Sequence, residues 1–183
     1  MSTLMRKNSS MSLRHALLGL LSHGPASGYD LLKQFELSLA NVWSATQSQV
    51  YTELGRLTDN GHLEVSDEGS RGRKEYRLTD SGRTELHHWL TQTRPKTVRR
   101  SETLLRVFFL DQVSRQEAVE YLKGIEADSE TELSQLEELE RSVPWDSSPL
   151  SIYGRIALEY GIRASSSQRD WAEWAARQVR DHT

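Results

Sequence analysis

Uncharged amide and hydroxyl side chains are concentrated in one short stretch of the sequence. Gln47, Ser48, Gln49 and Thr52 lie in it, and Arg56 follows. A Gln amide donates and accepts hydrogen bonds together, so on an exposed helical turn it can pair with a base edge in the major groove of DNA. The alternative interpretation is a solvated helix face that carries these residue types. The elements around the stretch decide between the two.

These polar residues fall within a helix that is predicted over residues 46–60. Val50, Leu54 and Leu57 recur at helical spacing and predict a buried stripe. The pair Asn60-Gly61 predicts the end of the helix, because Gly accepts the left-handed conformation after a last turn. With the stripe buried, the polar residues point away from the core.

Two shorter helices are predicted before this one. The first begins at Leu13 and ends at Gly24-Pro25, because Pro cannot continue a preceding helix. Ser27 is predicted to cap the second, whose apolar positions repeat every three or four residues. Those apolar positions are Tyr29, Leu32, Phe35, Leu39 and Val42.

A basic β-hairpin is predicted after the third helix. Residues 62–65 and 75–79 alternate apolar and polar side chains, which is typical of two strands with one buried face. The Gly-rich turn between them carries Arg71, Arg73 and Lys74, which can lie along a phosphate backbone. Such a tip alone is more often an ordinary surface loop. Three helices followed by a hairpin, however, are the elements of a winged helix-turn-helix in their usual order.

The remaining chain is predicted to be helical. A helix over 102–112, a long acidic helix capped by Ser114 and a last helix over 150–180 follow one another without strands. The long helix has an incomplete apolar seam from Leu122 to Leu139. We expect this seam, together with Phe108, Phe109 and Trp171, to pack against a second copy of the chain.

The fold class is therefore mainly α with a small β-hairpin wing, in an N-terminal winged helix-turn-helix and a C-terminal helical dimerisation domain. The predicted organisation is a flexible arm over 1–12, the DNA-binding domain over 13–93, a linker over 94–101 and the dimerisation and effector domain over 102–183.

Charge is distributed unevenly over the 183 residues, whose net charge is −3. Residues 1–100 carry 14 Lys and Arg against 10 Asp and Glu, whereas residues 101–183 carry 9 against 16. Only the first part is expected to face a polyanion, although ordinary scatter would also explain its modest excess. Cysteine is absent, which excludes thiolate zinc sites, iron–sulfur clusters and cysteine nucleophiles. Apolar runs are far too short to span a bilayer, and we expect a cytoplasmic protein.

Several motifs together resemble the PadR family of bacterial transcriptional regulators, in its longer branch with a virulence-activator-like helical C-terminal domain. The motifs are Leu17-Leu18-Gly19-Leu20-Leu21, Gly28-Tyr29-Asp30-Leu31, Trp43 with Gln49-Val50-Tyr51-Thr52-Glu53-Leu54, Tyr76-Arg77-Leu78-Thr79, and Leu104-Leu105-Arg106-Val107-Phe108-Phe109. The resemblance implies a dimeric winged-helix repressor that binds a palindromic operator and is modulated by a small molecule such as a phenolic compound.

The resemblance also implies roles for individual residues. Residues from Gln47 to Thr52 would enter the major groove, with Tyr51 at the phosphate-facing edge of the helix. Arg71, Arg73 and Lys74 would reach the backbone or minor groove from the wing. It implies no cofactor, and no group of residues identifies an effector site.

The two other function classes are an enzyme and a protein-interaction module. The six His residues are scattered, and the adjacent His87 and His88 point to different sides of a helix, so no metal site and no catalytic residues are expected. A winged-helix protein-interaction module that does not bind DNA is the alternative function, since a fold does not fix a function.

Overall fold

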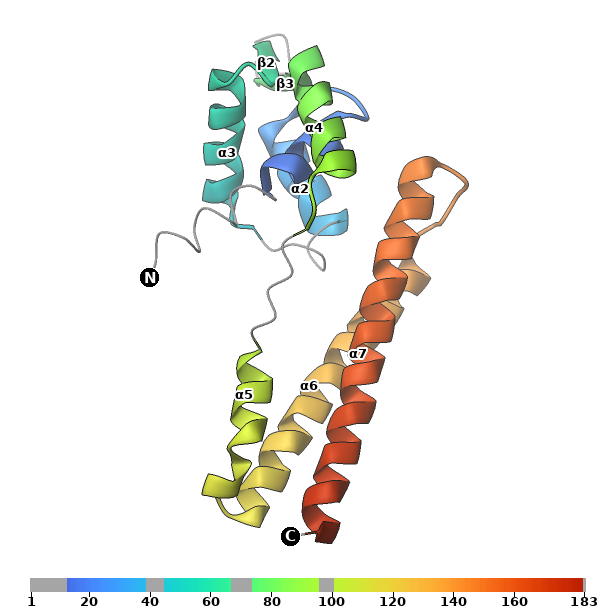
Figure 1. Ribbon diagram of the computed structural model, residues 1–183. Helices are drawn as coiled ribbons and strands as arrows, with labels where there is room; N and C mark the ends of the chain where they lie inside the picture. Colours follow the sequence, from blue (N-terminus) through green and yellow to red (C-terminus); the bar gives the residue numbers. More distant parts are fainter. Residues whose placement is uncertain (1–12, 39–44, 67–73, 96–100, 183) are drawn as a thin grey trace. The chain divides into compact units, whose positions relative to one another are not determined.

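The computed structural model describes residues 13–38, 45–66, 74–95 and 101–182. The chain divides into two compact units, Met1–Lys96 and Thr97–Thr183 (Figure 1). No helix among the described residues is long and apolar enough to cross a membrane.

The first unit contains helices and a small sheet, and the three predicted helices and the hairpin follow in the predicted order. A helix over 13–21 is followed by β1 (Ala26–Ser27), α2 (Gly28–Ser38), α3 (Gln47–Asp59), β2 (Leu63–Ser66), β3 (Glu75–Leu78) and α4 (Asp80–Gln92). Ser27 caps α2 as predicted, because its Oγ accepts a hydrogen bond from the Asp30 N–H at 3.2 Å.

The sheet is antiparallel, with strand order β1-β3-β2. Leu63 pairs with Leu78 across the predicted hairpin, and both side chains are buried. The prediction that Val65 is buried is wrong, since it is 37% exposed toward the far end of the edge strand β2. The sequence does not predict β1, which pairs Ala26 with Tyr76, because two residues are too short to show an alternating pattern.

Leucines from the first three helices and the hairpin form one core. Its buried members are Leu13, Leu17, Leu18, Leu21, Leu31, Phe35, Val50, Leu54, Leu57, Leu63 and Leu78. The prediction that Tyr29 belongs to this core is wrong, because Tyr29 is 58% exposed. It lies two residues from the buried Leu31, which places it on the other side of α2. Leu39 and Val42 lie outside the described residues.

The start of α4 is joined to the turn after α3. Thr79 caps α4 by accepting from the Gly82 N–H at 3.1 Å, and its Oγ1 donates to the Gly61 carbonyl at 2.8 Å. Gly61 has φ +70°, the left-handed conformation that the predicted helix end requires. Gly82 lies so close to the His62 carbonyl that there is no room for a side chain. These contacts place the hairpin strands between α3 and α4.

A buried histidine attaches α4 to the first helix. His15 is 3% exposed, its ring stacks on Trp89 at a centroid distance of 4.5 Å, and its Nε2 lies 3.1 Å from Glu85 Oε1. Burial alone would raise the pKa of Glu85, but the hydrogen bond with His15 and the charges of Arg14, His15 and His62 outweigh it and lower this pKa. Sequence periodicity does not reveal this contact, because its partners lie 70 residues apart.

The second unit consists of α5 (Glu102–Phe108), the 3-10 helix η2 (Leu110–Gln112), α6 (Arg115–Ser142) and α7 (Pro149–His182). Ser114 forms the predicted cap of α6, in a reciprocal capping box with Glu117. The prediction of one helix over 102–112 is wrong, because the α-helix ends at Phe108. After the break, Leu110 packs against the buried cluster of Leu122, Ala175 and Ala176.

The long helices α6 and α7 form an antiparallel hairpin with its own core. Leu122, Leu133 and Leu136 of α6 are buried, as are Ala172 and Ala176 of α7, whose small side chains allow close approach. The expectation that the Leu122 to Leu139 seam faces a second copy is therefore wrong, because α7 covers it. Trp171 likewise packs beside Leu122 within the chain, whereas Phe108 and Phe109 remain exposed as predicted.

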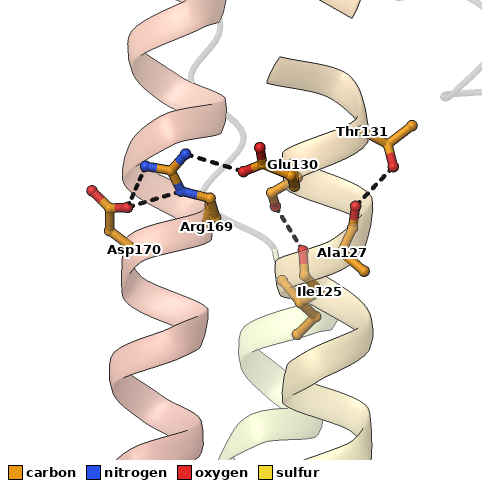
Figure 2. Close-up of polar contacts among 7 residues, drawn as sticks. Ile125, Ala127, Glu130, Thr131, Arg169 and Asp170 are labelled. Atoms are coloured by element: carbon orange, nitrogen blue, oxygen red, sulfur yellow. Dashed lines mark hydrogen bonds and ion pairs between the residues drawn. The ribbon is translucent and has the colours of Figure 1, made fainter. Parts of the chain in front are cut away.

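A polar bridge also joins the two long helices. Arg169 Nη1 donates to Glu130 Oε2 at 3.0 Å, and the same guanidinium reaches the neighbouring Asp170 (Figure 2). The partly exposed pair adds alignment more than stability, because solvent screens its attraction.

The close contact at Gly82 predicts a large effect of one methyl group. We expect Gly82→Ala to lower the free energy of unfolding by about 1–3 kcal/mol, because the new Cβ would meet the His62 carbonyl and lie 2.6 Å from Leu78 Cδ1. The matched control is Gly19→Ala, within the first helix, where nothing lies within 4 Å of the added atom. This control should be neutral or raise stability by up to about 1 kcal/mol. Urea denaturation measures the free energy of unfolding of both variants. Equal changes in the two would contradict a steric role of the close contact at Gly82.

The lowered pKa of Glu85 predicts a pH-dependent contribution to stability. A carboxyl group whose pKa is lower in the folded state stabilises the protein above its unfolded pKa, and this contribution disappears as pH falls through the folded pKa. Glu85→Gln should therefore lower the urea midpoint at pH 7, and its difference from wild type should shrink below the ordinary value of 4.5. Glu64→Gln, in the exposed pair with Arg77, is the control. A difference for Glu85→Gln that grows toward acid pH would refute the role.

Candidate nucleic-acid interface

Helix α3 presents a polar face because its opposite face is completely buried. Val50, Leu54 and Leu57 have 0% exposure, and they pack against the first helix, α2 and the hairpin. The predicted polar residues on the other side are all exposed: Gln47, Ser48, Gln49, Thr52 and Arg56. The predicted helix bounds are confirmed, with Thr46 as N-cap and Asn60 as C-cap.

The first turn of α3 is held by a capping box. Gln49 N–H donates to Thr46 Oγ1 at 3.3 Å, and the Thr46 N–H donates to Gln49 Oε1 at 2.8 Å. Gln49 therefore has a structural role that the sequence interpretation missed, although a Thr followed three residues later by Gln is a recognisable signal for it. Its amide oxygen is engaged, and its amide N–H₂ remains on the exposed turn.

Two further exposed side chains of α3 are oriented by local contacts. Thr52 Oγ1 donates to the Ser48 carbonyl at 2.7 Å. Arg56 Nη1 lies 3.2 Å from Glu53 Oε2, and the Arg56 side chain stays 60% exposed. Glu53 is only 5% exposed, so its buried carboxylate restrains the guanidinium at the helix surface.

An aromatic side chain, Tyr51, borders the polar face. Tyr51 is 41% exposed, and its ring packs on Gly28 at the start of α2, where a Cβ would lie 2.6 Å from Tyr51 Cε1. Burial raises the pKa of Tyr76, and the neighbouring Tyr51 raises it further. The exposed Tyr29 follows Gly28 in α2. Helical periodicity predicted that Tyr29 is buried, so the sequence did not indicate its exposure.

The wing is described only in part. The strands β2 and β3 bring Ser66 opposite Glu75, and the preceding Lys74 is exposed at the base of the hairpin tip. Arg71 and Arg73 lie outside the described residues. Among the described residues, no group of three or more His, Asp or Glu side chains could hold a metal ion.

A three-helix core with an exposed polar third helix, followed by a two-stranded hairpin, defines a winged-helix protein. The family model for the transcriptional regulator PadR-like family matches residues 17–88, and the model for the virulence activator alpha C-terminal region matches residues 99–180. The negative transcriptional regulator PadR of Bacillus subtilis is 35% identical over 169 residues, covering 88% of this chain and 92% of that protein. The chain therefore belongs to the PadR-like family of transcriptional regulators.

Solved structures give the same assignment. The chain is similar to the crystal structure of Bacillus subtilis PadR in complex with operator DNA, with a TM-score of 0.79 and 32% identity over 92% of this chain and 99% of that one. It is similar to the same regulator in complex with p-coumaric acid, with a TM-score of 0.80 and 33% identity over the same shares. The predicted fold class and family are confirmed.

The capping box predicts how two different substitutions of Gln49 change the stability of the protein. We expect Gln49→Ala to lower the free energy of unfolding by roughly 0.5–1 kcal/mol, because the Thr46 N–H loses its acceptor. Gln49→Glu should retain stability, since a carboxylate accepts the same bonds and suits a helix N-terminus. Thermal and urea denaturation of both variants, with Gln47→Ala as control, measures this. Equal stability of Gln49→Ala and wild type would show that the cap contributes nothing.

Proposed function

We propose that this regulator is a repressor that binds an inverted-repeat operator as a homodimer and is modulated by a small molecule. The observation that carries the proposal is the exposed amide and hydroxyl face of α3 above a fully buried apolar stripe. Uncharged groups on such a face suit the reading of base edges. The likeness to a negative regulator whose structure includes operator DNA supports the same function.

Contacts to DNA divide into two kinds in this proposal. Residues of α3 read bases in the major groove: Gln47, Ser48, Gln49, Thr52 and Arg56. Tyr51, at the edge of the same helix, contacts phosphate. The wing residues Arg71, Arg73 and Lys74 contact the backbone or minor groove without reading sequence. Residues 13–93 would thus form the DNA-binding domain, joined by a linker over 94–101.

Homodimerisation is assigned to residues 102–183. Apolar side chains of α5 and of the first half of α7 remain exposed within this unit: Leu104, Leu105, Phe108, Phe109, Leu150, Ile152, Tyr153 and Ile156. A single chain rarely exposes so many large apolar groups, which marks the faces that a second copy would bury. Two copies present two recognition helices, and the operator is then an inverted repeat.

The effector proposed for this chain is a phenolic compound. The support is the similarity to Bacillus subtilis PadR, which has been crystallised with p-coumaric acid. No pocket is assigned to it. A cytoplasmic location and the absence of enzymatic activity complete the proposal, and both are in keeping with a chain whose relatives are transcriptional regulators.

Selection of bound duplexes from a random pool by the purified full chain tests this proposal. An enriched inverted repeat, with half-sites about 34 Å apart, would support both DNA binding and dimerisation. Enrichment of a single half-site would contradict the dimer. The absence of any enriched sequence would favour the winged-helix protein-interaction module instead.

Substitutions separate the two kinds of contact. On the selected operator we expect Gln47→Ala to cost about 1–3 kcal/mol of binding free energy and to relax the preference at one base position, without changing the salt dependence. Lys74→Ala should weaken preferred and scrambled duplexes alike and reduce the salt slope by about 1. Fluorescence anisotropy at several salt concentrations measures both. A uniform loss for Gln47→Ala on every duplex would refute base reading by α3.

A further inference from the structure

The cations of the second unit differ in whether they have a counter-ion. Residues 101–182, all described, carry nine Arg and Lys side chains. Six have a carboxylate partner within 4.0 Å: Arg106, Arg141, Arg155, Arg163, Arg169 and Arg177. Arg169, between Glu130 and Asp170, is the example drawn in Figure 2. The other three cations, Arg115, Lys123 and Arg180, have no such partner among the described residues.

These three cations line one and the same surface cavity. Its volume is about 410 Å³, and its remaining lining residues are Gln116, Val119 and Glu120. Arg115 and Lys123 lie eight residues apart on one face of α6, two turns from each other. Arg180 reaches the cavity from α7, where its neighbour Val179 packs against the buried cluster of Leu122, Ala175 and Ala176. The packing of the two helices therefore brings the three cations together.

The cavity is positive within a unit that is otherwise acidic. Its lining holds three cations and a single carboxylate, that of Glu120, whose Oε1 accepts from Gln116 Nε2 at 2.9 Å. Residues 101–183 as a whole carry 16 Asp and Glu against 9 Lys and Arg. Unpaired like charges repel one another, and a bound anion would relieve that repulsion. Nearby carboxylates were available along both helices, yet these cations are not paired with them.

We propose that this cavity binds a small multivalent oxyanion of the phosphate class. Two guanidinium groups can each donate a pair of parallel hydrogen bonds to phosphate oxygens, and the ammonium group of Lys123 adds a point charge. The volume exceeds that of a single phosphate group, and Val119 with the aliphatic stems of the cations provides an apolar wall. The ligand is therefore inorganic phosphate or a phosphate ester with a small organic group.

Extended polyanions fit the cavity poorly. A duplex that reached these three cations would also meet acidic side chains of α6 outside the lining, such as Glu117, two residues from Arg115. A small anion avoids this repulsion because it contacts only the cavity lining. The site is thus distinct from the proposed DNA contacts of α3 and the wing.

Calorimetric titration of the full chain tests the proposal, with chloride adjusted to constant ionic strength. The probes are inorganic phosphate, pyrophosphate and ribose 5-phosphate. We expect Lys123→Gln/Arg180→Gln to weaken binding by at least about tenfold, and Glu120→Gln to strengthen it by roughly two- to fivefold, since it removes the only carboxylate of the lining. Tighter binding of ribose 5-phosphate than of phosphate identifies an organic ligand, and equal binding identifies the inorganic ion.

The matched control is Arg163→Gln, which also removes an exposed cation of α7 but one that is paired with Glu159. It should leave phosphate affinity within about twofold of wild type. An equal loss in Arg163→Gln, or the absence of binding of every probe up to about 10 mM, would overturn the proposal. Loss of operator binding in the double variant, without loss of phosphate binding, would overturn it too, because it would assign these cations to DNA. Circular dichroism verifies that each variant is folded.

Discussion

Burial of one stripe of α3 is the constraint on which the arrangement of the first unit depends. Val50, Leu54 and Leu57 are completely removed from solvent, and each contributes about 1.5–3 kcal/mol relative to an exposed position. Rotating α3 about its axis would expose them, so the helix has one orientation. The polar face follows from this, and the hairpin that carries the wing is tied to the same core through Leu63 and Leu78.

The two units use charge and apolar surface in different ways. In the first, the wing cations proposed to meet phosphate fall between β2 and β3 in the sequence, while Arg56 is restrained by the buried Glu53. In the second, most cations are paired with carboxylates of the same unit, and the apolar seam of α6 is buried against α7. The surfaces available to a second copy are therefore on α5 and the first half of α7. An acidic second unit also disfavours nonspecific contact with DNA, in keeping with the contacts proposed for α3 and the wing.

The sequence by itself determined the features whose causes lie within a few residues. The caps at Thr46, Thr79 and Ser114 need only an oxygen and an N–H three residues apart, and Gly61 ends α3 through its own conformational freedom. The exposed face of α3 follows equally from the spacing of its apolar residues. For these reasons most of the helices, the hairpin and the exposure of the proposed base-reading residues were predictable, whereas the break after Phe108 was not.

Only the tertiary structure decided the features whose partners are distant in the chain. Ala26 and Ser27 form the strand β1 because they pair with the edge of β3. Tyr29 is exposed because Leu31 lies on the buried side of α2. The apolar seam of α6 could be covered by α7 or by a second copy with equal hydrophobic gain, so periodicity could not choose. Likewise, the pairing of Arg169 with Glu130 across 39 residues, and the absence of such a partner for Arg180 among the described residues, depend on helix packing that no local pattern encodes.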